Sequence, residues 1–128
     1  DMVINIAAMK DGDAYLINEI KALMALKDQY DFILKVIVET ALLTVEELKY
    51  LTKLLTNLKV DYIKTSTGFA SRGVSLQDMQ IISAHKGPDL KIKASGGIKT
   101  TDFAYKLIAA GANRLGTSNA AQLLAGSD

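Results

Sequence analysis

The sequence predicts an α/β fold built on a parallel sheet, and two features of the chain carry that prediction. Short apolar runs alternate five times with segments whose apolar residues recur at helical spacing. The runs are apolar at nearly every position, as in parallel strands that are buried on both faces. A hydrophobic share of 49% over 128 residues provides one core. We therefore expect a single domain over residues 1–128, with right-handed crossovers between its strands.

Local signals place each element in chain order. The segment TVEE at 44–47 has the form of a capping box and precedes leucines at helical spacing. Asp13, Ser75 and either Thr100 or Thr101 are expected to cap three further helices. Strands are expected at 1–6, at 32–39, at 61–64, around Lys93 and at 113–116, and helices at about 13–27, 44–58, 75–87, 100–111 and 118–124.

The number of repeated units leaves two architectures open. Five strand–helix units are fewer than the eight that close a (β/α)8 barrel, and an open sheet has two unpaired edges. The fold is therefore either doubly wound or a partial barrel whose first three units lie elsewhere. The chain opens on Asp1-Met2 inside an apolar run, without a methionine in first place, and this favours a fragment of a longer protein.

Two lysines at matching places on successive strands indicate amine chemistry. Lys64 lies in DYIKTSTG and Lys93 in KIKASGG. On adjacent strands their backbones would lie about 4.8 Å apart. Ammonium groups about 6 Å apart repel by about 3 kcal/mol at an effective dielectric near 20, which corresponds to about 2 pKa units. Burial lowers a lysine pKa further, so we predict a partly unprotonated amine, which a Schiff-base nucleophile needs.

The alternative is that each lysine extends to solvent or pairs with a carboxylate such as Glu39 or Asp1. That alternative is favoured for a single lysine. Two lysines, each followed directly by a turn of hydroxyl and glycine residues, favour amine chemistry instead.

Glycine turns after three of the expected strands indicate an anion site. Gly68, Gly96-Gly97 and Gly116-Thr117-Ser118 each come just after a strand, and the last two lead quickly into helices. Glycine lets backbone N–H groups approach an anion, and a helix N-terminus adds partial positive charge. Lys99 either adds charge to this site or is a solvated residue at a helix start.

The acid–base candidates on the first two strands are Asp1, Lys35 and Glu39. Period-two alternation places Asp1 and Asn5 on one face of the first strand, and Lys35 and Glu39 on one face of the second. An Asp–Lys pair moves a proton or simply neutralises itself, and both readings stay open. His85 is expected to be a helix-end or surface residue.

Composition excludes several classes of function. The chain has no cysteine, so it forms no disulfide and has no thiol nucleophile, and its single histidine argues against a zinc site of the usual kind. A net charge of +1 and the lack of tryptophan argue against nucleic-acid binding. No apolar run reaches the length of a membrane span, and a cytoplasmic location is permitted.

Five segments together resemble consecutive motifs of the deoxyribose-phosphate aldolase family. The resemblance runs over essentially the whole chain. It implies a metal-independent class I aldolase without a cofactor, on a (β/α)8 TIM barrel of which this chain would supply strands four to eight. The substrate would be 2-deoxy-D-ribose 5-phosphate, cleaved to acetaldehyde and D-glyceraldehyde 3-phosphate in the cytoplasm. The segments are DMVINI (1–6), LKVIVET (34–40), YIKTSTGF (62–69), KIKASGGI (91–98) and RLGTS (114–118).

The resemblance also implies roles for individual residues. Lys64 matches the Schiff-base lysine, Lys93 the second lysine that lowers its pKa, and Asp1 the aspartate of the proton relay. Lys35 matches a lysine that lines the same pocket. The remaining substrate-binding and phosphate-binding positions are Thr67, Gly68, Gly96, Gly97, Lys99, Gly116 and Ser118.

Two other functions compete with this one. The chain could be a non-catalytic sugar-phosphate-binding or assembly fragment that completes its barrel with an N-terminal segment or with another copy of itself. It could also be another Schiff-base lyase on the same barrel. In each case the expected partner is a small molecule, with neither a nucleic acid nor a membrane.

Overall fold

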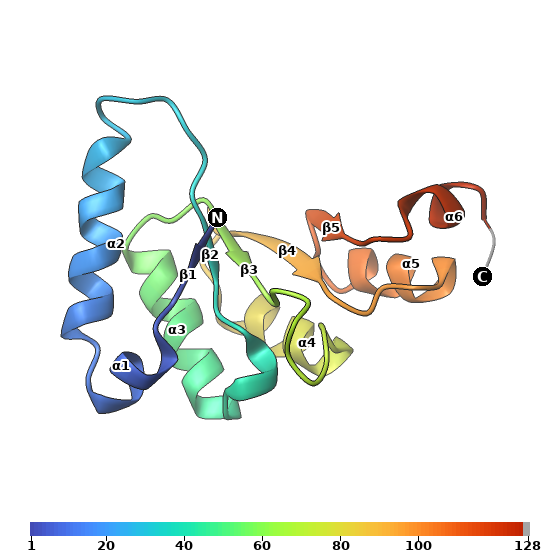
Figure 1. Cartoon of the computed structure of the whole chain (residues 1–128), viewed down its shortest axis with the longest axis horizontal. Coiled ribbons are helices and arrows are strands. Elements are labelled where there is room, and N and C mark those ends of the chain that lie inside the picture. Colours follow the sequence, from blue (N-terminus) through green and yellow to red (C-terminus); the bar gives the residue numbers. More distant parts are fainter. Residues whose placement is uncertain (127–128) are drawn as a thin grey trace.

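The computed structural model describes residues 1–126, which form a parallel sheet of five strands in the order β1-β2-β3-β4-β5 (Figure 1). At least one helix follows every strand, so the predicted alternation is confirmed. The strands are β1 (Met2–Val3), β2 (Lys35–Ile37), β3 (Tyr62–Lys64), β4 (Lys91–Ser95) and β5 (Arg114–Gly116). The helices are α1 (Ile6–Asp11), α2 (Ala14–Leu26), α3 (Val45–Asn57), α4 (Leu76–His85), α5 (Thr101–Ala109) and α6 (Ala120–Leu124), with a 3-10 turn at Thr40–Leu42.

The sequential strand order decides between the two architectures. A doubly wound sheet reverses its strand order at a switch point, whereas here every crossover joins two neighbouring strands. An unrolled (β/α)8 barrel has this order. The molecule is therefore an α/β partial barrel of five strand–helix units.

The face of the sheet toward the helices is the core. Met2, Val36, Ile63 and Ile92 lie side by side in the sheet register, and all four are buried. They belong to one hydrophobic cluster with residues of α2 to α5, among which Leu51, Met79 and Leu107 are fully buried. Burying such side chains contributes about 1.5–3 kcal/mol each.

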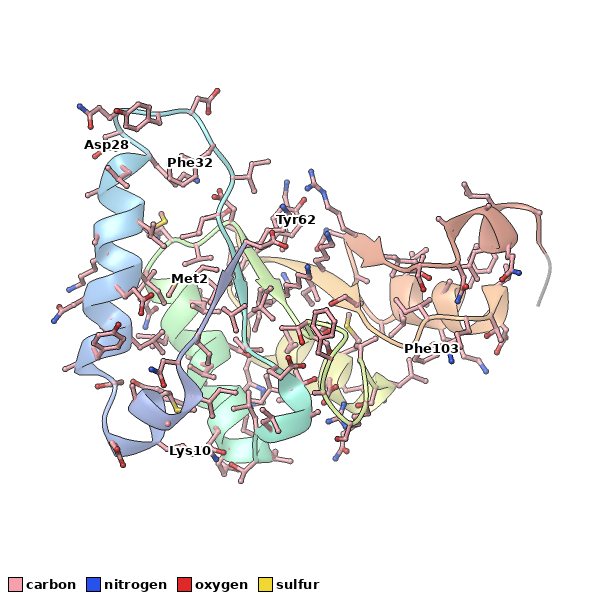
Figure 2. All side chains as sticks on the ribbon, in the orientation of Figure 1. Met2, Lys10, Asp28, Phe32, Tyr62 and Phe103 are labelled. Carbon is pink, nitrogen blue, oxygen red and sulfur yellow. The ribbon has the colours of Figure 1, made fainter. Side chains whose placement is uncertain are left out.

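The opposite face of the sheet is polar. The register row next to the core row runs Val3–Ile37–Lys64–Lys93–Arg114. Figure 2 shows Tyr62, two residues before Lys64, on the side of the sheet away from α2 and α3. Side chains alternate between the two faces of a strand, so the alternation that buries Ile63 is also what places both lysines on the polar face.

Helix caps explain most of the element boundaries. Thr44 and Ser75 form complete capping boxes with Glu47 and Asp78, and the Thr100 side chain accepts the Phe103 N–H. These predictions from sequence are confirmed.

The structure differs from the expected element boundaries at the first two strands, at the start of α2 and at the last helix. Asn5 does not extend β1, because its side chain accepts the Ala8 N–H at 3.0 Å and starts α1, a helix that was not predicted. Asp13 precedes α2, but its side chain makes no capping hydrogen bond. β2 ends at Ile37, because Glu39 adopts a left-handed backbone conformation with φ 55° that leaves the strand geometry. The last helix begins at Ala120, two residues after Ser118.

None of the helices in the described part of the chain is both long and apolar enough to cross a membrane.

Candidate active site

Asp1 bridges two of the predicted lysines. Its Oδ2 lies 2.8 Å from Lys64 Nζ, and its Oδ1 lies 3.4 Å from Lys35 Nζ. β1 and β3 flank β2, so a carboxylate just before β1 reaches lysines on both following strands. Both lysine side chains are mostly buried, at 16% and 17% exposure. The alternative in which a lysine pairs with a carboxylate thus holds for Lys64 toward Asp1, and not toward Glu39.

Lys93 lies opposite Lys64 in the sheet register and forms no ion pair with any residue in the range 1–126. Burial lowers the pKa of Lys93, and the charges of Lys64, Lys35 and Arg114 lower it further. Both causes were expected from the sequence. Within the described chain, Lys93 thus lacks the carboxylate contact that Lys64 makes with Asp1.

The polar face carries an excess of positive charge. The Arg114 guanidinium lies 4.8 Å from the centre of the Tyr62 ring, and Lys91 Nζ lies 5.8 Å from the same centre. A ring face attracts a cation weakly, which fixes these two groups beside the lysine pair. Cations therefore surround Lys93 on this face, whereas the Asp1 carboxylate pairs with Lys35 and Lys64.

A pocket of about 360 Å³ opens beside the two lysines. The turns after β3, β4 and β5 form its walls, at the carboxyl ends of the strands, where α/β barrels place their sites. The pocket brings together most of the predicted residues, whereas Asp1 and Lys35 lie outside its lining, next to Lys64. The predicted residues in the lining are Lys64, Thr67, Gly68, Lys93, Gly96, Gly97, Lys99, Gly116 and Ser118; the others are Ser66, Ser95, Ile98, Thr117 and Asn119.

Backbone amides of the three turns remain available to a ligand. Within the described chain, the N–H groups of Gly68, Gly97 and Ser118 donate to no protein acceptor. Gly68 and Gly97 have positive φ values, 96° and 72°, which let the backbone turn so tightly. Free amides beside a lysine are a suitable arrangement for an anion.

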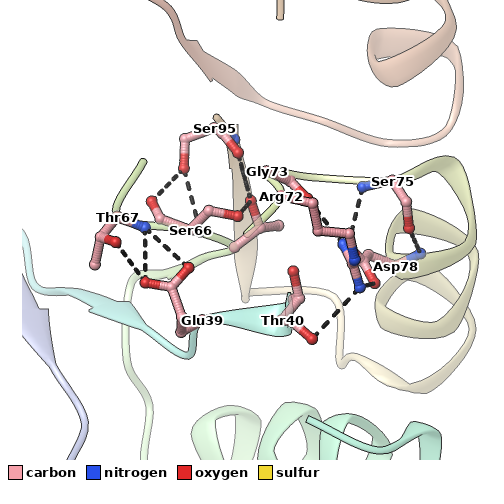
Figure 3. A network of polar contacts seen from close by, with 10 residues as sticks. Glu39, Thr40, Ser66, Thr67, Arg72, Gly73, Ser75, Asp78 and Ser95 are labelled. Carbon is pink, nitrogen blue, oxygen red and sulfur yellow. Dashed lines mark hydrogen bonds and ion pairs between the residues drawn. The ribbon is translucent and has the colours of Figure 1, made fainter. Parts of the chain in front are cut away.

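Hydroxyl groups connect the turns to one another. Ser95 Oγ donates to the Ser66 carbonyl at 2.7 Å and accepts the Ser66 N–H at 3.3 Å (Figure 3). Thr117 Oγ1 donates to the Ile98 carbonyl at 2.7 Å. The sequence prediction missed both serines, although each follows a site lysine by two residues, and this repeated Lys-x-Ser spacing is the signal that could have found them.

A second part of the network holds the loop between β3 and α4. Arg72 donates to Asp78 at 2.7 and 3.2 Å, and to the carbonyls of Gly73 and Thr40 (Figure 3). Gly73 packs so closely on Gly96 that an added Cβ would lie 2.0 Å from the Gly96 carbonyl oxygen. No local pattern announces these contacts, because they join residues from different turns.

The remaining candidates lie apart from the pocket lining. Glu39 is buried, and its carboxylate accepts hydrogen bonds from Thr67. His85 ends α4, with Nδ1 2.8 Å from the Ile81 carbonyl oxygen. Residues 1–126 contain no cluster of three or more histidine, cysteine, aspartate or glutamate side chains that could hold a metal ion.

Curated proteins with similar sequences are deoxyribose-phosphate aldolases. That of Malacoplasma penetrans is 46% identical over 127 residues, which cover 98% of this chain and 56% of the relative. That of Thermococcus kodakarensis is 40% identical over 127 residues, covering 98% and 57%. No protein-family model matches the chain.

Solved structures give the same result. A putative deoxyribose-phosphate aldolase from Coccidioides immitis superimposes with a TM-score of 0.89 at 35% identity, covering 98% of this chain and 50% of that one. A structure described as QR15, an aldolase, gives 0.83 at 38% identity, covering 91% and 52%. The enzyme from Aeropyrum pernix, described as a unique tetrameric structure, gives 0.84 at 28% identity, covering 96% and 52%.

The chain spans about half the length of the curated relatives it matches. By sequence and by fold it is a relative of the deoxyribose-phosphate aldolases.

Proposed function

We propose that this chain is the lysine-bearing part of a metal-independent class I deoxyribose-phosphate aldolase and supplies strands four to eight of its barrel. The observation that carries the proposal is the pair Lys64 and Lys93, in register on neighbouring strands beside a pocket with free backbone amides. The names of the relatives support the substrate, 2-deoxy-D-ribose 5-phosphate, and a cytoplasmic location is part of the same proposal.

In the proposed reaction, the neutral amine of Lys64 attacks the C1 aldehyde and water leaves, which forms an iminium. The C2–C3 bond then breaks, its electron pair moves toward the iminium nitrogen, and the C3 hydroxyl loses its proton. Glyceraldehyde 3-phosphate departs, and an enamine remains on Lys64. Protonation of the enamine at C2 and hydrolysis release acetaldehyde and restore the amine.

Lys93 and Asp1 are proposed to transfer protons during the reaction. The positive charge of Lys64 makes it easier for Lys93 to lose its proton. Lys93, whose pKa is lowered by burial and by neighbouring cations, gives up its proton more readily than an ordinary lysine and is suited to proton transfer. Asp1 contacts Lys64 directly and would hold it in place for attack while relaying a proton through water.

The turns are proposed to bind the phosphate. The N–H groups of Gly68, Gly97 and Ser118, which have no protein acceptor in the described chain, would donate to the phosphate oxygens. Lys99 adds a positive charge at the pocket. Thr67, Gly96 and Gly116 complete the lining, and Lys35 supports the amine side of the site through Asp1.

Reductive trapping tests the proposal. Acetaldehyde with borohydride should add one ethyl group, and peptide mass mapping should locate it on Lys64. Lys64→Arg should abolish the adduct, whereas the matched control Lys91→Arg, on the same face but outside the pocket lining, should keep it. A folded chain that traps no acetaldehyde, or traps it only on Lys93, would contradict the assignment of Lys64.

The assembly alternative is favoured by one observation. β1 and β5 each have a neighbour on one side only, so both edges are open to pairing. Size-exclusion mass and aldolase assays with and without an added N-terminal segment separate the two functions. Activity that appears only with the segment would favour a fragment that completes its barrel with a partner.

A further inference from the structure

Glu39 is a buried carboxylate for which the proposed chemistry has no use. It is 6% exposed and forms no ion pair with any described residue, although lysines lie on the strands around it. Burying an unpaired carboxylate is costly unless hydrogen bonds satisfy it. Its hydrogen-bond partners therefore indicate what the Glu39 side chain does.

Those partners all belong to one residue of the candidate anion site. The Thr67 N–H lies 3.3 and 3.4 Å from the two carboxylate oxygens, and the Thr67 hydroxyl donates to Oε2 (Figure 3). The same hydroxyl accepts the Phe69 N–H at 3.2 Å. Glu39 thus binds Thr67, and the Thr67 hydroxyl in turn binds the Phe69 N–H, while the Gly68 N–H between them has no protein acceptor in the described chain and lies at the pocket.

The backbone on either side of Glu39 is hydrogen-bonded to the end of β3 and to the residue that follows it. The Val38 N–H donates to the Lys64 carbonyl at 3.0 Å, and the Thr40 N–H donates to the Thr65 carbonyl at 2.9 Å. Between these two bonds Glu39 adopts φ 55° and ψ 71°, a left-handed conformation that is unfavourable for a residue with a side chain. Such strain persists where the surrounding structure determines it, and it is typical of functional sites.

We propose that Glu39 is a positioning residue for phosphate binding: it holds the Thr67–Gly68 turn so that the Gly68 amide faces the pocket, and it never contacts substrate. The inference rests on the proposed function, since it assumes that this pocket takes the substrate phosphate. It assigns Glu39 to phosphate affinity and separates it from the acid–base chemistry of the lysines.

Two variants of Glu39 test the role. Glu39→Gly removes the carboxylate and also relieves the left-handed strain, so the fold should persist. Glu39→Gln keeps the shape and can still accept the Thr67 N–H, while its NH2 group reverses the bond to the hydroxyl. Glu46→Gln, a matched change at an exposed glutamate of α3, is the control.

Binding of inorganic phosphate, followed by NMR shifts of the Gly68 and Gly97 amides, should weaken about tenfold or more in Glu39→Gly. The loss should be smaller in Glu39→Gln and absent in Glu46→Gln. Trapping of acetaldehyde, which carries no phosphate, should be unchanged in all three variants.

Unchanged phosphate affinity in Glu39→Gly would overturn the positioning role alone. Loss of acetaldehyde trapping in parallel with phosphate binding would also overturn it, because Glu39 would then act on the Lys64 strand as a whole. If the unaltered chain bound no phosphate at these amides, the proposed sugar-phosphate site itself would fail, and the role of Glu39 with it.

Discussion

At the scale of single residues, the two lysines differ by one contact. Asp1 lies against Lys64 and Lys35, and Lys93, one strand further from β1, lies beyond its reach. The motifs KTSTG and KASGG are alike in sequence, so their local pattern could not show which lysine has the carboxylate. That difference arises only when β1, β2 and β3 are assembled.

Gly116 gives a prediction about the space around Lys93. A Cβ at this position would lie 3.2 Å from Lys93 Cε and 3.1 Å from Ser95 Cβ, and the backbone of Gly116 is not in the left-handed region. We expect Gly116→Ala to displace the Lys93 side chain and to slow acetaldehyde trapping several-fold. The free energy of unfolding should fall by about 1–3 kcal/mol, because the Cβ of buried Ser95 cannot move aside as the flexible end of a lysine can.

Trapping rates and chemical denaturation, measured on the same Gly116→Ala sample, check this prediction. An unchanged trapping rate in a folded variant would show that the position of Lys93 does not matter for the amine chemistry.

At the scale of elements, the start of α4 stabilises the wall of the pocket. Burial raises the pKa of Asp78, but hydrogen bonds from Arg72 and from the Ser75 N–H more than offset this effect, and the net pKa is lowered. Arg72 also holds the Thr40 and Gly73 carbonyls. The same side chains thus cap a helix and fix the loop between β3 and α4.

The lowered pKa of Asp78 predicts how stability depends on pH. A carboxyl with a depressed folded-state pKa contributes stability that is present above its unfolded pKa, near 3.9, and lost as pH falls through the folded value. Asp78→Asn should therefore destabilise the chain by about 1–3 kcal/mol at neutral pH. It should also flatten the loss of stability in acid.

Denaturation between neutral pH and acid measures both effects. The matched control is Asp102→Asn in the first turn of α5, whose ion pair with Lys106 is exposed; it should change stability by about 0.5 kcal/mol or less. Equal effects of the two substitutions would show that burial and the Arg72 contacts add nothing at Asp78.

Local signals predicted the elements well where one residue decides the outcome. Thr44, Ser75 and Thr100 cap helices as expected, because capping depends on residues three positions apart. The sequence places Asn5 and Glu39 in strands because both lie within or at the end of apolar runs. Both leave the strands for reasons outside the pattern: a competing cap at Asn5, and hydrogen bonds to a distant turn at Glu39.

At the scale of the whole molecule, the partial barrel explains why the site residues come together. Parallel strands in sequential order bring the ends of β3, β4 and β5 to one edge, so turns separated by more than twenty residues line one pocket. The repeated motif predicted this gathering. The contacts among the turns, such as that between Gly73 and Gly96, depend on tertiary packing, which spacing in the sequence does not encode.

The central claim is that Lys93 shares a partly buried face with Lys64, where desolvation and the charge of Lys64 lower the pKa of Lys93. An NMR titration of the lysine side-chain nitrogens tests it most directly. We predict that Lys93 titrates below the ordinary lysine value of 10.5, that Lys64→Met raises its pKa, and that Lys91→Met leaves it unchanged. A Lys93 that titrates at or above the ordinary value, with no response to Lys64→Met, would contradict the account.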